Sequence, residues 1–494
     1  MAKPNVLLII TDQWRGDCLG CAGHPDVKTP YLDTLSAEGF RFTHACSATP
    51  TCIPARAALY TGMAQENHRR VGYQDGVRWD YPHTLAGTFA DAGYQCHCAG
   101  KLHVHPLRSS MGYHSVDLHD GYLHYYRRPE RTYSENQRIA DDYFYWLQKE
   151  LGIDADPINT GIDCNSWTGR PWPYGENTHP TRWVTDRGID FLRKRDRDKP
   201  FFLTLSYVRP HPPFDAPEPF WAMYRGKKLT PPKRGDWDNT DRLARDGRTA
   251  DSETGPADPE LMEMAQMGYY ASMTQVDYEI GRLRDALFAQ GLDRSNTIIA
   301  FVSDHGELLG DHCLFRKSLP YEGSAHVPFI ISASAEALRN AGYTGETDVT
   351  DKLTELRDVM PTLLALCGIA VPDTVDGINL FGKEDRTFLH GEHLYDGESC
   401  QWIVAHEDGR RDKFVWFSGS GRKQYFHLTT DPDETHDGID DDVYAHRIAE
   451  LEKRLTDALA WREEGFVRDG KLTPGAVCRP VLEHSLRENR DYSI

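Results

Sequence analysis

The chain has 494 residues, of which 39% are apolar, and it carries a formal net charge of -19 at pH 7. This length predicts two or three domains with a sizeable core. The acidic charge argues against a nucleic-acid-binding surface, so we expect no nucleic acid partner. The eleven cysteines are odd in number and scattered, which disfavours a disulfide framework.

The first apolar run, residues 6–10, is far too short to span a bilayer, and no signal-peptide cleavage site lies beside it. No later apolar run approaches about 20 residues, the length that a membrane helix needs. We therefore expect no membrane partner and a cytoplasmic location. Residues 6–10 fit a buried strand instead.

Strands and helices alternate along the first three quarters of the chain. The predicted strands are residues 6–10, 94–99, 201–208, 297–303 and 327–332. The predicted helices are residues 29–39, a helix opened by Pro54, and residues 84–92, 182–194, 268–289 and 353–366. Continuous apolar strands between helices indicate an α/β fold with a large, mostly parallel sheet flanked by helices.

The pattern changes near residue 372. Short strands are predicted at residues 388–390, 401–406, 413–418 and 424–428, followed by a helix whose apolar face includes Ile448, Leu451 and Leu455. We therefore divide the chain into an α/β domain, residues 1–371, and a smaller C-terminal domain, residues 372–494, with an antiparallel sheet plus a helix. Residues 105–180 and 231–259 fit long irregular loops, which in compact domains are usually functional or mobile.

Reactive side chains follow four of the predicted strands. They are Asp12 and Gln13, Lys101 and His103, His211, and Asp304 and His305. The carboxyl ends of parallel strands share one edge of a sheet, where ligands bind. Taken singly, each residue has a structural explanation, because an aspartate after a strand often only forms a turn or caps a helix. The convergence of four strand ends is what favours a functional site.

Cys52 lies just before the helix that Pro54 opens. The free N–H groups and the positive end of the helix dipole favour an anion there. Arg56, one turn further on, adds a cation close to Cys52. From these residues alone, a buried structural cysteine at a helix start is the competing explanation.

The pattern Cys52-x-Pro54-x-Arg56 resembles the signature of type I sulfatases, which belong to the alkaline phosphatase superfamily and convert this cysteine to formylglycine. The similarity extends over most of residues 3–370. It includes the Gly-Lys-Leu-His sequence at 100–103, the Ser-Asp-His-Gly-Glu sequence at 303–307 and Lys317. Many members have aspartate at the position of Gln13 and asparagine at that of His305. These two residues occur in branches that include choline sulfatases and phosphonate monoester hydrolases.

The resemblance implies a divalent metal ion held by four residues, Asp12, Gln13, Asp304 and His305. Three of the four offer oxygen, which suits Ca²⁺ best. Mn²⁺ and Mg²⁺ are the alternatives.

The resemblance also implies the roles of the remaining residues. Lys101 and Lys317 meet the sulfate group, and Arg56 steadies the formylglycine diol derived from Cys52. His103 is the candidate base for the diol, and His211 the candidate acid for the leaving oxygen. His390 and His393, with residues 105–180, are expected to shape the leaving-group subsite. A formylglycine-generating or sulfatase-maturing enzyme is the implied protein partner.

The chain is therefore identified as a sulfatase that hydrolyses a small-molecule sulfate monoester to an alcohol and inorganic sulfate. We expect a small sulfated sugar, because the predicted rim is rich in aromatic residues and the few cations suit one tetrahedral anion. A phosphonate monoester or phosphodiester hydrolase, or a choline sulfatase, is the alternative enzyme. A non-catalytic anion-binding protein with unconverted Cys52 is the alternative from another class.

Overall fold

The computed structural model describes residues 3–121, 141–345 and 349–491. A seven-stranded sheet lies at its centre, in the order β2-β8-β7-β1-β6-β4-β5. Its strands are β1 (Asn5–Asp12), β2 (Phe40–Arg41), β4 (Gln95–Gly100), β5 (Ser115–Leu118), β6 (Phe201–Pro210), β7 (Thr297–Ser303) and β8 (Phe329–Ser332). The strands β5, β4, β6, β1 and β7 run parallel, whereas β8 is antiparallel to β7 and to β2. The predicted large, mostly parallel sheet is confirmed.

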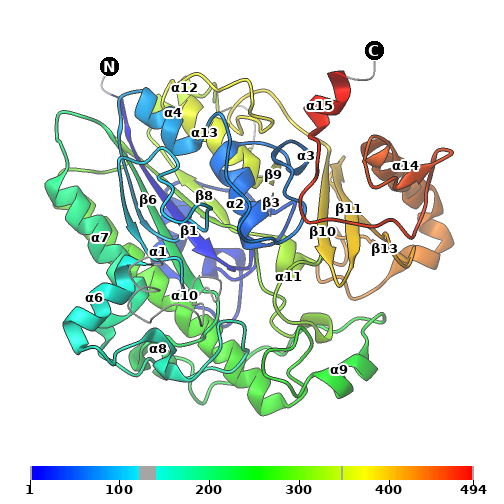
Figure 1. Cartoon of the computed structure of the whole chain (residues 1–494), viewed down its shortest axis with the longest axis horizontal. Helices are drawn as coiled ribbons and strands as arrows, with labels where there is room; N and C mark the ends of the chain where they lie inside the picture. The colour runs from blue at the N-terminus through cyan, green and yellow to red at the C-terminus, as the bar shows by residue number, and fades with distance from the viewer. Residues whose placement is uncertain (1–2, 122–140, 346–348, 492–494) are drawn as a thin grey trace.

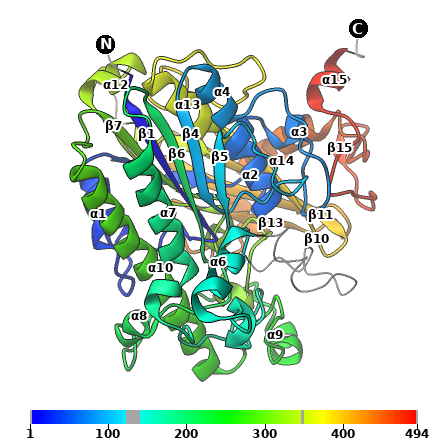
Figure 2. The same ribbon diagram turned by 60° about the vertical axis from the view of Figure 1, so that its left-hand side comes forward.

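Helices cover both faces of this sheet (Figures 1 and 2). On β1, Leu7 and Ile9 pack on one side, while Val6 and Leu8 pack on the other. The first face is covered by α1 (Pro30–Ala37), α7 (Pro180–Lys194) and α10 (Pro259–Phe288). The second is covered by α2 (Cys52–Thr61), α4 (Leu85–Asp91), α12 (Ala335–Asn340) and α13 (Val359–Leu366). Burial on both faces explains why the strands are continuously apolar.

The C-terminal region forms a separate four-stranded antiparallel sheet, in the order β10-β11-β12-β13. The strands are β10 (Phe388–Tyr395), β11 (Glu398–Glu407), β12 (Arg410–Phe417) and β13 (Lys423–Phe426). Two Asp-Gly pairs, at 396–397 and 408–409, form its first two hairpin turns, and all four residues have positive φ angles. One face of the sheet packs on α14 (Ala445–Leu459), and the other on Leu308, Leu319 and Tyr321. The boundary at residue 371 stays a prediction.

Several predicted boundaries are wrong. Residues 353–366 begin as strand β9 (Leu353–Glu355), because these residues pair with β3 (His44–Cys46), and only the later part is helical. The long helix starts at Pro259 rather than at residue 268, since the Asp258 side chain caps its first turn. The expected loops also contain α6 (Asp142–Leu151) and α9 (Thr240–Asp246), although residues 122–140 lie outside the described part.

Shorter elements complete the fold. They are α3 (Gln65–His68), α8 (Glu218–Ala222), α11 (Glu322–Ala325), α15 (Leu486–Asp491), β14 (Val467–Arg468) and β15 (Lys471–Leu472). Among the described helices, none is both long enough and apolar enough to cross a bilayer.

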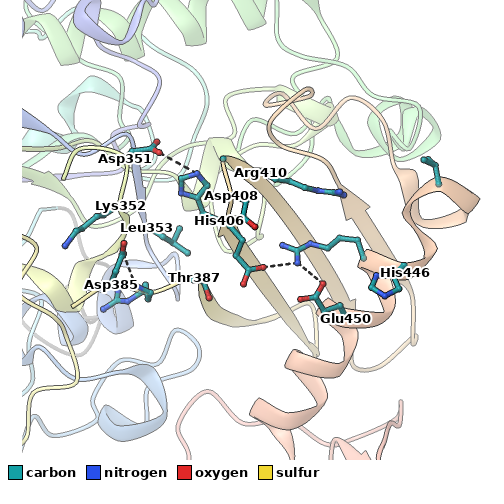
Figure 3. A pocket seen from close by; sticks show the side chains of 15 residues that line it. Asp351, Lys352, Leu353, Asp385, Thr387, His406, Asp408, Arg410, His446 and Glu450 are labelled. Carbon is teal, nitrogen blue, oxygen red and sulfur yellow. Dashed lines mark hydrogen bonds and ion pairs between the residues drawn. The ribbon is translucent and has the colours of Figure 1, made fainter. Parts of the chain in front are cut away.

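A charged cleft of about 1010 Å³ lies between residues 351–353 and 385–387 on one side and the C-terminal sheet with α14 on the other. Figure 3 shows Asp351 reaching toward His406 of β11 across this cleft, and Glu450 of α14 among its lining residues.

Candidate active site

The predicted functional residues meet at one edge of the central sheet. β1, β4, β6 and β7 all end there, and the first residue of α2, Cys52, lies at the same place. A cavity of about 480 Å³ opens onto this edge. Its lining includes Cys52, Lys101, His103, His211, Lys317 and His393.

Cys52 is buried, and three of the predicted functional side chains lie close to its sulfur atom. Its Sγ lies 3.3 Å from Nε2 of His305, 3.6 Å from Oδ1 of Asp12 and 3.5 Å from Nζ of Lys317. Burial and Asp12 act to raise the pKa of the Cys52 thiol, but the charges of Lys101 and Lys317 outweigh them, so the pKa is lowered. The position therefore favours an anionic group.

The side chains of Asp12, Cys52, Asp304 and His305 each offer a ligand atom, and these atoms lie within 4.8 Å of one another. Nδ1 of His305 is 2.9 Å from the carbonyl oxygen of Gly306 and can only donate to it, so Nε2 carries the lone pair. This nitrogen lies 3.5 Å from Oδ1 of Asp12 and 3.6 Å from Oδ1 of Asp304.

Burial lowers the pKa of His305 and favours its neutral form. A lone pair facing two carboxylate oxygens is unfavourable unless a cation lies between them. Donation from the other ring nitrogen to a carbonyl is also the arrangement that orients histidine ligands of metal ions. The residues present therefore fit a divalent metal ion.

Gln13, the remaining predicted ligand, lies beside this cluster. Its backbone has a φ of 74°, and its N–H donates to Oδ1 of Asp304 at 3.2 Å. The side-chain oxygen accepts from Nζ of Lys317 at 2.6 Å, and the side-chain nitrogen donates to Glu307.

Arg56 is fully buried behind the cluster and does not line the cavity. Its Nε donates to Oδ2 of Asp304 at 2.9 Å, and its Nη1 donates to the carbonyl oxygen of Lys101 at 2.9 Å. The Lys101 ammonium in turn donates to Asp12. Burial acts to raise the pKa of Asp12, but Lys101, His211 and Lys317 together hold it well below its usual range.

His103 and His211 have different surroundings. His103 Nε2 lies 3.5 Å from Oδ1 of Asp75 and 3.5 Å from the Tyr73 hydroxyl, which itself donates to Asp75 at 2.9 Å. Burial and Lys101 act to lower the pKa of His103, yet contacts with Asp75 and Cys52 raise it overall. His211 donates from Nδ1 to the Pro212 carbonyl at 2.8 Å. Burial and the charge of Lys317 hold the pKa of His211 well below its usual value.

The structure separates the two histidines of the predicted subsite. His393 lines the cavity and hydrogen-bonds Oγ1 of Thr51 at 2.8 Å. His390 does not line it and contacts Gln401 at 2.7 Å and Glu66 at 3.0 Å. The reason is that residues three apart on a strand point to opposite faces.

Several residues at the site have no individual role in the sequence predictions. Tyr73, Asp75, Cys164, Asn165, Glu253, Arg316 and Tyr395 also line the cavity. Of these, Cys164 and Asn165 belong to the long loop expected to form the rim. Glu307 lies outside the lining but stands in the 303–307 motif, which is the one local signal that pointed to it.

A second cluster of metal-ligand type, made by His44, Asp351 and His406, lies next to the charged cleft, which Asp351 and His406 line. His44 Nε2 is 2.9 Å from Oδ1 of Asp351. Nδ1 of His44 accepts from the Arg411 guanidinium at 2.8 Å, so the ring proton lies on Nε2 and points to Asp351. His44 is therefore occupied as a hydrogen-bond donor, and this cluster is a polar contact between β3 and the C-terminal sheet rather than a metal centre.

The chain is similar to known proteins over most of its length. A family model described as Sulfatase matches residues 4–369. An arylsulfatase of Clostridium perfringens is 45% identical over 96% of this chain and 98% of its own length. A multifunctional alkaline phosphatase superfamily protein of Trinickia caryophylli is 30% identical over 94% of this chain and 96% of its own. The crystal structure of the phosphonate monoester hydrolase of Agrobacterium radiobacter superposes with a TM-score of 0.71 at 25% identity, covering 93% of this chain and 96% of that one.

Proposed function

The chain belongs to the sulfatase family and hydrolyses sulfate esters, and from this premise we propose that its substrate is a small sulfated sugar or a similar alcohol sulfate. The observation that carries the proposal is the composition of the cavity wall. Two lysines, Lys101 and Lys317, supply the charge for one tetrahedral anion, while Tyr73 and Tyr395 offer rings for a sugar face and Asn165 a polar group for hydroxyls. A cavity of about 480 Å³ lies in the range of small-ligand pockets.

We propose that Cys52 is converted to formylglycine by a maturing enzyme. When hydrated, this group supplies an oxygen nucleophile and a second hydroxyl whose deprotonation lets the sulfate leave. Those oxygens would take the place of Sγ of Cys52, which lies among a lysine, a histidine and a carboxylate. An unmodified thiol would instead leave a stable sulfur–sulfur adduct.

The four predicted ligands, Asp12, Gln13, Asp304 and His305, would hold one divalent metal. Three of them offer oxygen, so Ca²⁺ is the first choice, and Mn²⁺ or Mg²⁺ is the alternative because imidazole is a softer ligand. The metal would supply positive charge that neutralises sulfate oxygens.

Each remaining side chain has a distinct role in the proposal. Lys101 and Lys317 bind the sulfate oxygens, and buried Arg56 orients the carboxylates of Asp12 and Asp304. His103, whose pKa is raised, takes the proton from the second hydroxyl of residue 52.

His211 donates a proton to the leaving oxygen. Its low pKa arises from burial and then from Lys317, and a bound sulfate neutralises that lysine, which favours protonation of His211 when substrate is present. Once protonated, a group of low pKa is a strong acid.

Choline sulfate is the second candidate substrate, favoured by a specific observation. Three carboxylates, Asp75, Glu253 and Asp396, line the cavity together with Tyr73 and Tyr395, as a site for a quaternary ammonium requires. Glu253 is partly neutralised by Arg316 at 3.8 Å, which makes the wall less acidic than the residue types alone indicate.

The test is kcat/KM for monosaccharide sulfates, choline sulfate and a phosphonate monoester, measured with enzyme whose residue 52 has been characterised by mass spectrometry. We expect a monosaccharide sulfate to lead. A lead of about tenfold or more for choline sulfate or the phosphonate, equal to about 1.4 kcal/mol in transition-state binding, would refute the sugar assignment. Intact Cys52 in active native enzyme would refute the formylglycine. The cytoplasmic location stays part of the proposal and is tested by cell fractionation.

A further inference from the structure

Gln13 is held at every polar group that it possesses. Its backbone N–H donates to Oδ1 of Asp304 at 3.2 Å, and its backbone carbonyl accepts from the Tyr269 hydroxyl at 2.6 Å. Its side-chain amide lies between Lys317 and Glu307. The positive φ of 74° is a conformation that non-glycine residues seldom adopt, so these contacts have to maintain it.

The chemistry of the two neighbours decides which way the amide points. An ammonium group can only donate, so the atom that faces Lys317, at 2.6 Å from Nζ, must be the oxygen Oε1. The NH₂ group then faces Glu307, whose Oε2 accepts from it. The amide oxygen therefore faces Lys317, whose Nζ also lies 3.5 Å from Sγ of Cys52 in the buried cluster.

Glu307 is itself held in place from the opposite side. It is fully buried, and its Oε1 accepts from the backbone N–H groups of Leu309, at 2.9 Å, and Arg316. These donors belong to the loop that also carries Lys317. The acceptor that contacts Gln13 is therefore fixed by the backbone and is not free to turn toward another partner.

We propose that Glu307 is a positioning residue, which favours glutamine over an acidic residue at position 13 and turns the Gln13 amide so that its oxygen faces the metal site. The inference rests on the proposed metal site, in which Gln13 is a ligand. It accounts for glutamine at a position where many family members have aspartate, because a carboxylate at residue 13 would lie against the buried carboxylate of Glu307.

A single and a double isosteric substitution test whether Glu307 orients the Gln13 amide. In Glu307→Gln, the new amide keeps its oxygen on the Leu309 and Arg316 N–H groups and presents NH₂ to Gln13. Two NH₂ groups then oppose each other, and turning the Gln13 amide over would bring its NH₂ against the Lys317 ammonium. The side chain can no longer satisfy both neighbours, so its oxygen is displaced from its place beside the metal site. In the double variant Gln13→Glu with Glu307→Gln, the carboxylate at residue 13 accepts from the new NH₂ and again presents oxygen.

The first experiment measures Ca²⁺ affinity of metal-stripped protein by isothermal titration calorimetry. We expect Glu307→Gln to weaken binding by about tenfold or more, as loss of groups that orient ligands does, and the double variant to recover most of that loss. The matched control is Asp277→Asn, another buried carboxylate that accepts from two backbone N–H groups, those of Tyr31 and Leu32. It should leave Ca²⁺ affinity unchanged.

Wild-type affinity in Glu307→Gln, or a double variant that binds no better than Glu307→Gln, would overturn the inference. A wild type that binds no divalent metal would instead overturn the proposed metal site.

A second measurement tests the contact without metal. In the presence of a chelator, Gln13→Glu should lower the melting temperature, because it buries two facing carboxylates, and adding Glu307→Gln should restore it. Equal melting temperatures for the single and double variants would show that residues 13 and 307 are not coupled.

Discussion

The molecule contains two clusters of histidine and aspartate that look alike in composition and differ in chemistry. One, with Asp12, Asp304 and His305, lies at the edge of the central sheet. The other, with His44, Asp351 and His406, lies next to the cleft at the C-terminal sheet. His305 donates from Nδ1 to a carbonyl, whereas His44 accepts from Arg411 at the same atom. The hydrogen-bond partner of Nδ1 therefore determines whether Nε2 offers a lone pair or a proton to the carboxylates.

Burial separates the clusters as well. All three side chains of the first cluster are fully buried, while the Asp351 side chain is 63% exposed. Charges that are removed from water need counter-charges, which Lys101 and Arg56 supply to the buried carboxylates and a metal would supplement. An exposed carboxylate is already stabilised by solvent. This difference in burial predicts that mutations in the first cluster have the larger effects on function.

Removing a carboxylate from the buried cluster should abolish function. Asp304→Ala takes away a proposed metal ligand and leaves the Arg56 guanidinium without its carboxylate partner at 2.9 Å. We expect turnover at the level of background and no bound metal by elemental analysis, with the fold retained by circular dichroism. Full turnover after exhaustive chelation of the wild type would contradict this assignment.

His211→Ala should affect substrates unequally. A nitrophenolate leaves without a proton, whereas a sugar alkoxide needs one, so loss of a general acid should reduce kcat for a sugar sulfate by about 10²–10⁴-fold and for nitrophenyl sulfate far less. The measurement is kcat on both substrates for the two enzymes. Equal losses would show that His211 is not the acid.

Mutations in the cluster of His44, Asp351 and His406 should change the stability of the fold rather than the turnover of substrate. Burial, and then the charges of Arg411 and His406, lower the pKa of His44 from 6.5 to about 4. The unfolded chain then binds a proton at a pH where the folded chain does not, so this group destabilises the fold progressively as pH falls from 6.5 to about 4.

Replacing this histidine removes that proton linkage. His44→Gln should therefore flatten the dependence of the melting temperature on pH in this window, relative to wild type. A pH dependence identical to that of the wild type would argue that His44 titrates normally in the folded protein.

The smallest effect is expected at the other side of the cleft. His406→Ala should leave kcat/KM and the metal content within about twofold of wild type, because its contact with exposed Asp351, at 3.7 Å, is worth little. Loss of one equivalent of bound metal would overturn the distinction between the two clusters.

Much of the central sheet was predictable because its signals are local. Continuous apolar runs indicated β1, β6 and β7, and the polar residues after them could be assigned to one edge from the rule for parallel strands alone. The C-terminal hairpins also carry local signals, in short apolar runs separated by Asp-Gly turns. Strand β9 was not predicted, because its pairing with β3 joins residues such as Cys46 and Glu355, which are far apart in the chain.

The sequence by itself determined the family, the α/β class and the set of reactive residue types at the strand ends. Only the tertiary structure decided which of them share a cavity, that Arg56 lies behind the cluster, and that His393 lines the cavity while His390 faces away. It also decided the hydrogen-bond partners of Gln13, His44 and His305. The physical reason is that a ring tautomer or an amide orientation is set by the atom opposite it, and in a folded chain that atom belongs to a residue that no local pattern identifies.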